Sequence, residues 1–292
     1  MAIQSIDNLI SAISAGQTAR YDWNKITGAS AYTAGRWYDT SMLAGLPIAN
    51  AWAGTALNWR TCDEATGNGT QIFGIPHGGN VSANIKHLLN MSAWSTAATG
   101  VPGTLMLVDL QGYWPGISNN TTSAQTLVGT PSLRYANGAG CRLYWVQTAA
   151  AGATAQNIAL SYTDQDATAG NTLPVTVAMT ASGIVGHISH AGVAANNYGP
   201  FLPLASGDTG VQNVASVTFS AANTGTGALC LARPLAQITL SVVGLMTEKD
   251  LLNQIPSLPQ VKDGACLVWL YGAGAATAAS TTFAGGLEFV HG

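Results

Sequence analysis

From Ala29 onward, apolar and polar residues alternate along short segments, which is the period of a β-strand with one buried face. Clusters of Gly, Asn and Pro separate these segments at the spacing typical of β-sandwiches and barrels. Strands do not alternate with helices, which argues against a parallel doubly wound sheet. The twelve candidate strands are 35–40, 71–76, 104–110, 132–136, 141–147, 157–163, 173–179, 214–220, 228–232, 238–243, 265–271 and 286–290. We therefore predict a mainly β chain that folds as an antiparallel β-sandwich or jelly-roll-like domain over residues 29–292.

The first residues have the period of a helix instead. One apolar stripe at helical spacing is formed by Ile3, Ile6, Leu9, Ile10 and Ile13. We predict that residues 1–28 form a short helix followed by an arm that docks on a neighbouring surface. A helix packed only on its own domain is the alternative. Two further short helices are predicted over residues 84–94 and 247–255, the second ending before Pro256.

Three connections have the features of β-hairpins. Asn137 and Gly138 form a turn signal between the fourth and fifth candidate strands, and softer loops follow the fifth and the sixth. Together these connections predict a continuous antiparallel meander from about residue 132 to residue 180. No Pro-rich or Ser-rich linker divides the chain after residue 28, so we expect one extended β domain.

Charged residues make up 8% of the chain, against about 25% in ordinary globular domains. The ten Lys and Arg residues are scattered, and no two are adjacent, which argues against binding to nucleic acid or to anionic membranes. The four charged residues between Leu143 and Thr247 are Asp164, Asp166, Asp208 and Arg233. Weakly charged surfaces of this extent indicate burial against partners, so we predict a homo-oligomer. A β protein coated with Thr, Ser and Asn is the alternative.

The four cysteines show none of the spacings of zinc sites or redox motifs. Cys62, Cys141, Cys230 and Cys266 are far apart in sequence, and three of them lie in apolar runs, so we expect buried, reduced thiols. The first residues lack the basic region and cleavage site of a signal peptide. The stretch 264–279 is too short and too rich in Gly to cross a membrane. We expect synthesis in the cytosol.

Two histidines lie three residues apart, but no third metal ligand is close to them in sequence. In a strand, His187 and His190 would point to opposite faces, so we expect structural histidines rather than a metal site. His77 or His87 could be combined with Ser82 and Asp109 in a triad, but no nucleophile motif surrounds that serine. We therefore predict no enzymatic activity, no catalytic residue and no cofactor.

Two acidic loops, 63–69 and 164–171, only begin the pattern of a calcium loop. Asp164 and Asp166 have the right spacing, but Thr168 and Ala169 break the pattern, so we expect a solvated hairpin loop. The eight Trp residues are spread along the whole chain, mostly inside β runs or beside Gly and Pro turns. We interpret them as anchors of a core or an interface, with a sugar-binding face as the alternative.

Several stretches resemble structural proteins of tailed-bacteriophage virions, in particular the β-rich proteins that decorate or cement the capsid. The stretches are IPHGGNVSANIKHLLNMSAW, LMLVDLQGYWPGI, TPSLRYANGAGCRLYWVQT, NIALSYTDQDATAGNTLPVTV and NNYGPFLPLASGDTGVQNVASVTF. The resemblance covers most of the chain. It implies a protein that coats or cements a bacteriophage capsid through protein–protein contacts, as a homo-oligomer and often a trimer. It also implies the major capsid protein as a partner, location in the virion, synthesis in the host bacterial cytoplasm and no catalytic residues.

Two other functions stay open at this point. A phage tail protein or a receptor- or carbohydrate-binding β protein would show exposed Trp and Tyr gathered in one area. The major capsid protein itself would show a long spine helix and a charged extended loop, and neither is evident in the sequence.

Overall fold

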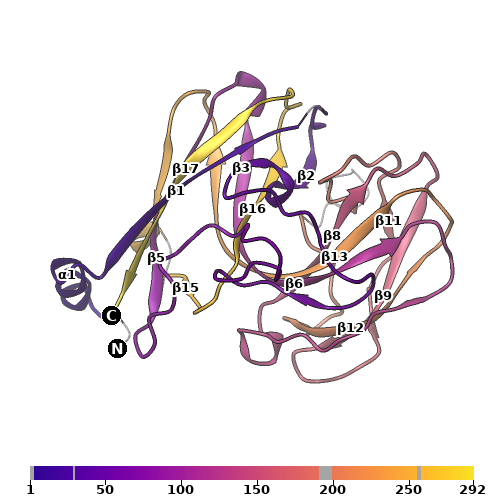
Figure 1. The fold of residues 1–292 in the computed structure, drawn as a ribbon, viewed down its shortest axis with the longest axis horizontal. Coiled ribbons are helices and arrows are strands. Elements are labelled where there is room, and N and C mark those ends of the chain that lie inside the picture. The colour runs from indigo at the N-terminus through magenta and orange to yellow at the C-terminus, as the bar shows by residue number, and fades with distance from the viewer. Residues whose placement is uncertain (1–2, 29, 191–198, 255–257) are drawn as a thin grey trace.

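The computed structural model describes residues 3–28, 30–190, 199–254 and 258–292. The described strands form three antiparallel sheets, and the predicted mainly β, sandwich-like fold is confirmed. Figure 1 shows the first sheet at one end of the molecule beside α1, the second sheet at the opposite end, and the third sheet between them.

The first sheet joins the two ends of the chain, because β1 pairs with β17 along its whole length. The strand order is β14-β5-β17-β1-β3, and β15 also pairs with β5. The strands are β1 (Thr18–Ile26), β3 (Ala44–Leu46), β5 (Lys86–Ser95), β14 (Thr247–Asp250), β15 (Gln260–Val261) and β17 (Thr282–His291).

The second sheet is the smallest in extent and has the order β10-β9-β12-β7, with β11 also paired to β9. Its strands are β7 (Gln125–Thr126), β9 (Gln156–Asp164), β10 (Asn171–Thr172), β11 (Val177–Met179) and β12 (Val211–Phe219). Along β9, buried and more exposed residues alternate, which is the pattern of a strand that covers a core with one face.

The third sheet is built on two long strands and packs against both other sheets. Its order is β2-β16-β6-β13-β8, and β4 pairs with β6. Its strands are β2 (Arg36–Asp39), β4 (Arg60–Thr61), β6 (Gly103–Ser118), β8 (Arg142–Ala149), β13 (Thr226–Leu240) and β16 (Leu267–Ala273). Because β6 and β13 are long, one end of each contributes to the core under the first sheet and the other end to the core under the second.

A short loop segment closes the third sheet on itself. Residues 186–188, the closing segment, hydrogen-bond to β2 through Asp39 N to Gly186 O (2.8 Å) and Ile188 N to Trp37 O (2.9 Å). On the other side, Gln147 N of β8 donates to His187 O (2.9 Å), and Gly186 N donates to Gln147 O (2.8 Å). The two outer strands of this sheet are therefore joined, and a third apolar core lies along the enclosed face.

The helices agree only in part with the sequence-based prediction. The N-terminal helix is confirmed as α1 (Ile6–Ser14). The predicted helix 84–94 is wrong, because these residues form β5, whose apolar run is shared between two strand neighbours. The predicted helix 247–255 begins with β14, and α2 (Leu251–Gln254) follows; its last residue lies outside the described residues. Short 3₁₀ turns occur at Thr40–Met42, Ala98–Gly100 and Ala136–Gly138.

Most predicted strands are present, but the predicted meander from 132 to 180 is wrong. Residues 132–136 form no strand, and 71–76 contribute only an isolated bridge between Ile75 and Leu267. The stretches 228–232 and 238–243 belong largely to one continuous strand, β13. The connection from β8 to β9 passes from the third sheet to the second, because β8 pairs with β13 and β9 with β12. The β9–β11 hairpin is confirmed.

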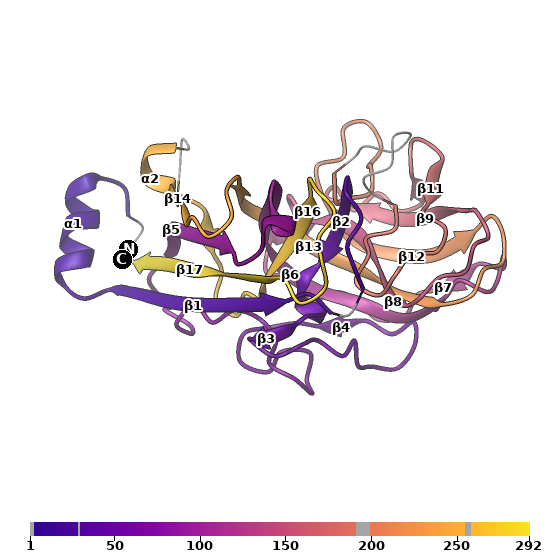
Figure 2. The same ribbon diagram turned by 90° about the horizontal axis from the view of Figure 1, so that it is seen from above.

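The second half of the segment predicted as a docking arm lies within the chain's own first sheet. Strand β1 is flanked by β17 along its whole length and by β3 near its end. Its inward residues Trp23 and Lys25 are buried. Of the two regular elements in this segment, α1 lies outside the sheets, at the start of β1 (Figure 2).

Several Trp rings lie on cross-strand glycines. A Cβ on Gly227 would lie 2.0 Å from the ring of Trp145, and a Cβ on Gly272 would lie 3.0 Å from the ring of Trp37. Gly112 faces Trp59 in the same way, at 2.4 Å. Glycine leaves room for a large ring to cover the neighbouring strand, which explains why this chain is rich in both residue types.

Candidate functional site

The most exposed apolar surface on a regular element is one face of α1. Ile6, Ile10 and Ile13 lie at helical spacing i, i+4 and i+7, and 65%, 55% and 46% of their surfaces are exposed. The adjoining side of the helix buries Leu9 and Ala12 against the end of the first sheet. The helix therefore has one broad apolar face, and its own chain covers only part of it.

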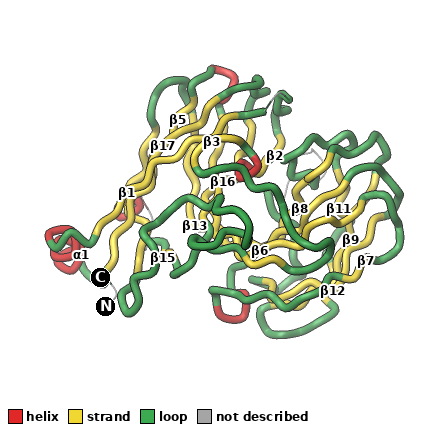
Figure 3. The backbone as a smooth tube through the Cα atoms, in the orientation of Figure 1, coloured by secondary structure: helices red, strands yellow, loops and turns green. Residues whose placement is uncertain are grey.

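Local sequence fixes the position of α1. The Ser5 side chain caps the helix by accepting a hydrogen bond from Asn8 N at 3.1 Å. The helix ends at Ser14, Gly16 follows with a φ of 71° that glycine readily adopts, and β1 begins two residues later. Figures 1, 2 and 3 show α1 at the end of the first sheet, where β1 begins. In this position Leu9 and Ala12 are covered, and Ile6, Ile10 and Ile13 stay exposed.

A second exposed apolar area lies at the opposite end of the first sheet. The loop between β13 and β14 exposes Val242, Leu245 and Met246 by 52%, 60% and 50%, and Leu46 at the end of β3 is 60% exposed. Gly244 N donates to Ser95 O at 2.9 Å, which ties this loop to the end of β5. A first sheet with exposed apolar residues at both ends is unusual for a protein that stays monomeric.

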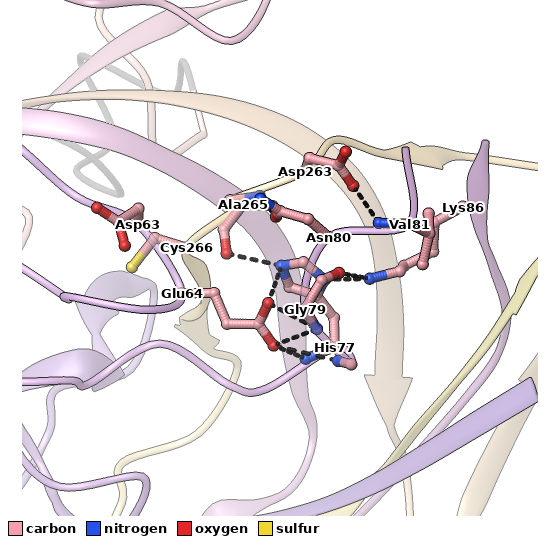
Figure 4. A network of polar contacts seen from close by, with 12 residues as sticks. Asp63, Glu64, His77, Gly79, Asn80, Val81, Lys86, Asp263, Ala265 and Cys266 are labelled. Atoms are coloured by element: carbon pink, nitrogen blue, oxygen red, sulfur yellow. Dashed lines mark hydrogen bonds and ion pairs between the residues drawn. The ribbon is translucent and has the colours of Figure 1, made fainter. Parts of the chain in front are cut away.

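A buried polar cluster connects the long loop after β4 to β5 and β16 (Figure 4). The Glu64 carboxylate accepts from the backbone N–H groups of His77 (2.6 Å), Gly78 (3.1 Å) and Gly79 (3.0 Å). Glu64 also lies 3.1 Å from His77 Nε2, and Lys86 Nζ donates to His77 Nδ1 at 2.7 Å. The ring proton is thus on Nε2, which faces Glu64 and the carbonyl oxygen of Ala265.

The cluster has the geometry of a structural clamp rather than of a catalytic site. Burial lowers the pKa of His77 and that of Lys86. Among the described residues, no hydrogen bond joins Ser82 or Asp109 to His77, so the structure does not assemble the triad considered from the sequence. The carboxylate of Asp109 instead binds the guanidinium of Arg134 at 3.1 Å, on the buried side of β6.

His87 is likewise separate from these groups. Its Nδ1 lies 3.3 Å from Leu258 O, and burial lowers its pKa. Among the described residues, His87 has no hydrogen bond to a side chain that could act as a nucleophile.

His187 and His190 lie in the connection between β11 and β12, and both are fully buried. His190 Nε2 donates to Pro200 O at 3.2 Å, and its Nδ1 accepts from Trp145 N at 3.4 Å. The ring of His187 lies against Tyr38, with 5.2 Å between centroids, and neither of its nitrogens has a hydrogen-bond partner among the described residues. Burial lowers the pKa of each histidine to about 3, so both are neutral at pH 7.

The acidic loops that begin a calcium pattern fold by binding their own backbone. Asp164 accepts from Asp166 N (2.8 Å) and Thr168 N (2.9 Å), and Asp63 accepts from Thr66 N at 2.7 Å. Within the described ranges, no group of three or more His, Cys, Asp or Glu side chains is arranged to hold a metal ion.

Two buried charged groups stabilise the segment that runs from the end of β2 through β3. Asp39 accepts from Ser41 N (2.7 Å) and Tyr144 Oη (2.8 Å), and burial raises its pKa. Lys25 Nζ donates to the carbonyl oxygens of Pro47 (2.6 Å) and Leu43 (3.2 Å). Burial lowers the pKa of Lys25 to about 8.

The cysteines and most tryptophans lie in the core. All four cysteines are buried and unpaired, and burial raises the pKa of Cys62. Five of the eight Trp residues are buried, and Trp37, Trp59 and Trp94 are half-buried on separate elements. The described aromatic residues therefore form no exposed cluster, as expected for core anchors. In the part of the chain that the structure describes, no helix has the length and hydrophobicity needed to cross a membrane.

No protein-family model and no curated protein matches the sequence. Weak structural neighbours are proteins of viral particles. The VP2 subviral particle of infectious bursal disease virus is 11% identical, with a TM-score of 0.18 over 94% of this chain and 80% of that chain. The T=1 particles derived from VP2 of the same virus give 12% identity and a TM-score of 0.17, over 94% and 77% of the two chains. At TM-scores this low, the likeness carries no argument about fold or function.

Proposed function

We propose that this chain is a structural, non-enzymatic protein of a bacteriophage virion. In this proposal it coats or cements the capsid as a homo-oligomer, with a trimer as the expected form, and contacts the major capsid protein. It is made in the host bacterial cytoplasm and ends in the virion, without nucleic acid, membrane or cofactor as a partner.

The observation that supports this proposal most directly is the exposed apolar face of α1. Three isoleucines on one helix face each keep about half of their surface exposed, and burying that half would contribute roughly 1–1.5 kcal/mol for each before entropic costs. Helices bind grooves on partners through anchors at this spacing. Since the chain's own first sheet covers only Leu9 and Ala12 of this helix, a neighbouring molecule is the natural acceptor for the three isoleucines.

The composition supports the same proposal. Charged residues make up only 8% of the chain, and interfaces of permanent assemblies are depleted of charge. We expect the interface to bury more than about 2,000 Å² in total, as permanent assemblies do.

Light scattering of the purified chain tests the proposal. The wild-type protein should form one defined oligomer at micromolar concentration, and Ile10→Asp should shift it to the monomer. Val128→Asp is the matched control, because Val128 is also exposed by 53% but lies outside α1. A wild-type protein that is a folded monomer on its own, and that also fails to bind capsids, would rule the proposal out.

A further inference from the structure

The outer face of the first sheet carries a groove to which no residue of α1 contributes. Two adjoining cavities, of about 370 and 50 Å³, share Arg20 and Met246 in their lining. The larger one reaches Leu46 and Trp94, and the smaller one reaches residues of β5, β14 and β17. We call this combined hollow the outer groove.

The floor of the outer groove is low at Gly286, in the middle of the sheet. Gly286 pairs with Asp22 and Ser92, and a Cβ on it would lie 2.9 Å from Asp22 Oδ1 and 3.0 Å from the Arg20 guanidinium. Its neighbour Gly285 faces the core instead, because it pairs with the buried Trp23 and Ala93. Glycine inside a strand often marks a place where a ligand or another backbone comes close, and here Gly286 hollows out the centre of the outer face.

One wall is aromatic and apolar, and the rest is polar and charged. Trp94 is half-buried and stands beside Met246. Arg20 binds Glu288 at 2.8 Å and Asp22 at 3.3 Å, and these side chains keep 53%, 35% and 75% of their surfaces exposed. The remaining polar lining residues are Asn24, Asn90, Ser92 and Glu248.

This lining does not have the character of a protein interface. The centres of protein interfaces are depleted of charged residues, whereas this groove gathers four of them in a chain with only 8% charge. Planar carboxylate, amide and guanidinium groups offer donors and acceptors to hydroxyl groups, and an indole ring offers a flat face to C–H groups. A sugar ring carries both kinds of group.

We propose that the outer groove binds a neutral oligosaccharide, with a sugar ring packed on Trp94 and its hydroxyl groups bound by Arg20, Asp22 and Glu288. Its volume lies at the lower end of the range of ligand sites, which suits one or two sugar rings. The lining carries one guanidinium and three carboxylates, a net charge of −2 (1 − 3), so acidic sugars should be excluded.

An array of neutral and sialylated oligosaccharides tests this site. The wild-type chain should bind neutral members and leave sialylated members unbound. Trp94→Ala should weaken binding at least tenfold, and Trp94→Phe should recover part of it. Gly286→Ala should also weaken binding, because the new methyl group displaces Asp22 and Arg20. The control is Trp37→Ala, since Trp37 is also half-buried but lines a separate cavity.

Three results would overturn the site: no bound oligosaccharide, a preference for sialylated members, or full binding by a folded Trp94→Ala chain. Displacement of a bound oligosaccharide by an unrelated extended peptide would assign the groove to protein instead. The site does not depend on assembly through α1. Ile10→Asp should therefore keep oligosaccharide binding, and Trp94→Ala should keep the oligomer seen by light scattering.

Discussion

The closing segment and α1 depart from the usual distribution of residues in opposite directions. At the closing segment, His187 and its neighbour His190 are polar but completely buried. On α1, Ile6, Ile10 and Ile13 are apolar but exposed. The buried histidines lower the free energy of unfolding, because each must stay neutral in the core. The exposed isoleucines leave about half of their surface in water, and only a partner can bury that half.

Lowering the pH should have the largest effect, because His187 of the closing segment and the nearby His190 must stay neutral in the core. His77 and His87, whose pKa burial also lowers, act in the same direction. The folded pKa of His187 and His190 is about 3, below the unfolded value of about 6.5. The unfolded chain therefore binds more protons below pH 6.5, and stability is lost as the pH falls from 6.5 toward 3. Between pH 7 and pH 5, each histidine should cost about 2 kcal/mol, or about 4 kcal/mol for the pair.

Denaturant titrations at pH 7 and pH 5 measure this loss. Asp39 acts in the opposite direction, because burial raises its pKa and favours the folded state as the pH falls. A free energy of unfolding that does not change between pH 5 and pH 7 would contradict the buried positions of the two histidines.

Replacing one histidine separates its contribution from all others. His187→Phe should remove about 2 kcal/mol of the loss between pH 7 and pH 5. At pH 7 the substitution should leave the free energy of unfolding nearly unchanged, because neither ring nitrogen of His187 bonds to a described residue and the ring packs on Tyr38. The same titrations on the variant test this. An unchanged pH dependence in the variant would refute it.

The smallest effect on folding should come from α1. Ile10→Asp should change the free energy of unfolding of the monomer by less than about 0.5 kcal/mol, because this side chain is 55% exposed. Leu9→Ala on the buried face of the same helix serves as the contrast and should cost about 2 kcal/mol or more. Equal losses from both variants in denaturant titrations would show that the exposed face belongs to the fold.

The sequence predicted the strand content well, since runs such as 265–271 contain β-branched and aromatic residues bounded by turn signals. It failed at β5, where the leucines and methionine of 84–94 fit a helical spacing as well as a strand. Only the neighbouring strands β17 and β14 decide between the two. It failed again at residues 132–136, because Arg134 there is drawn to Asp109 of β6, a contact far away in sequence.

The candidate sites, like the strands, could be predicted from the sequence only in part. The apolar stripe of α1 was visible in the sequence, but which of its residues are exposed depends on where the end of the first sheet lies. The outer groove was not predicted, because Arg20, Trp94 and Glu288 come from three strands distant in sequence. Gly286 was the one local signal for it, since glycine inside a strand often marks a close approach.

The pairing of β1 with β17 has a consequence for when this protein can fold. Thr18 and Val290 are partners 272 positions apart (290 − 18), so the middle of the first sheet cannot form before β17 has been synthesised. Contacts between such distant residues slow folding, because the loop must be closed before the contact stabilises it. Until β17 leaves the ribosome, β1 can pair only with β3 near its end, and α1 lacks Val290 to pack on. The helix therefore reaches its final orientation only once β17 has been made, and association through α1 is delayed until then.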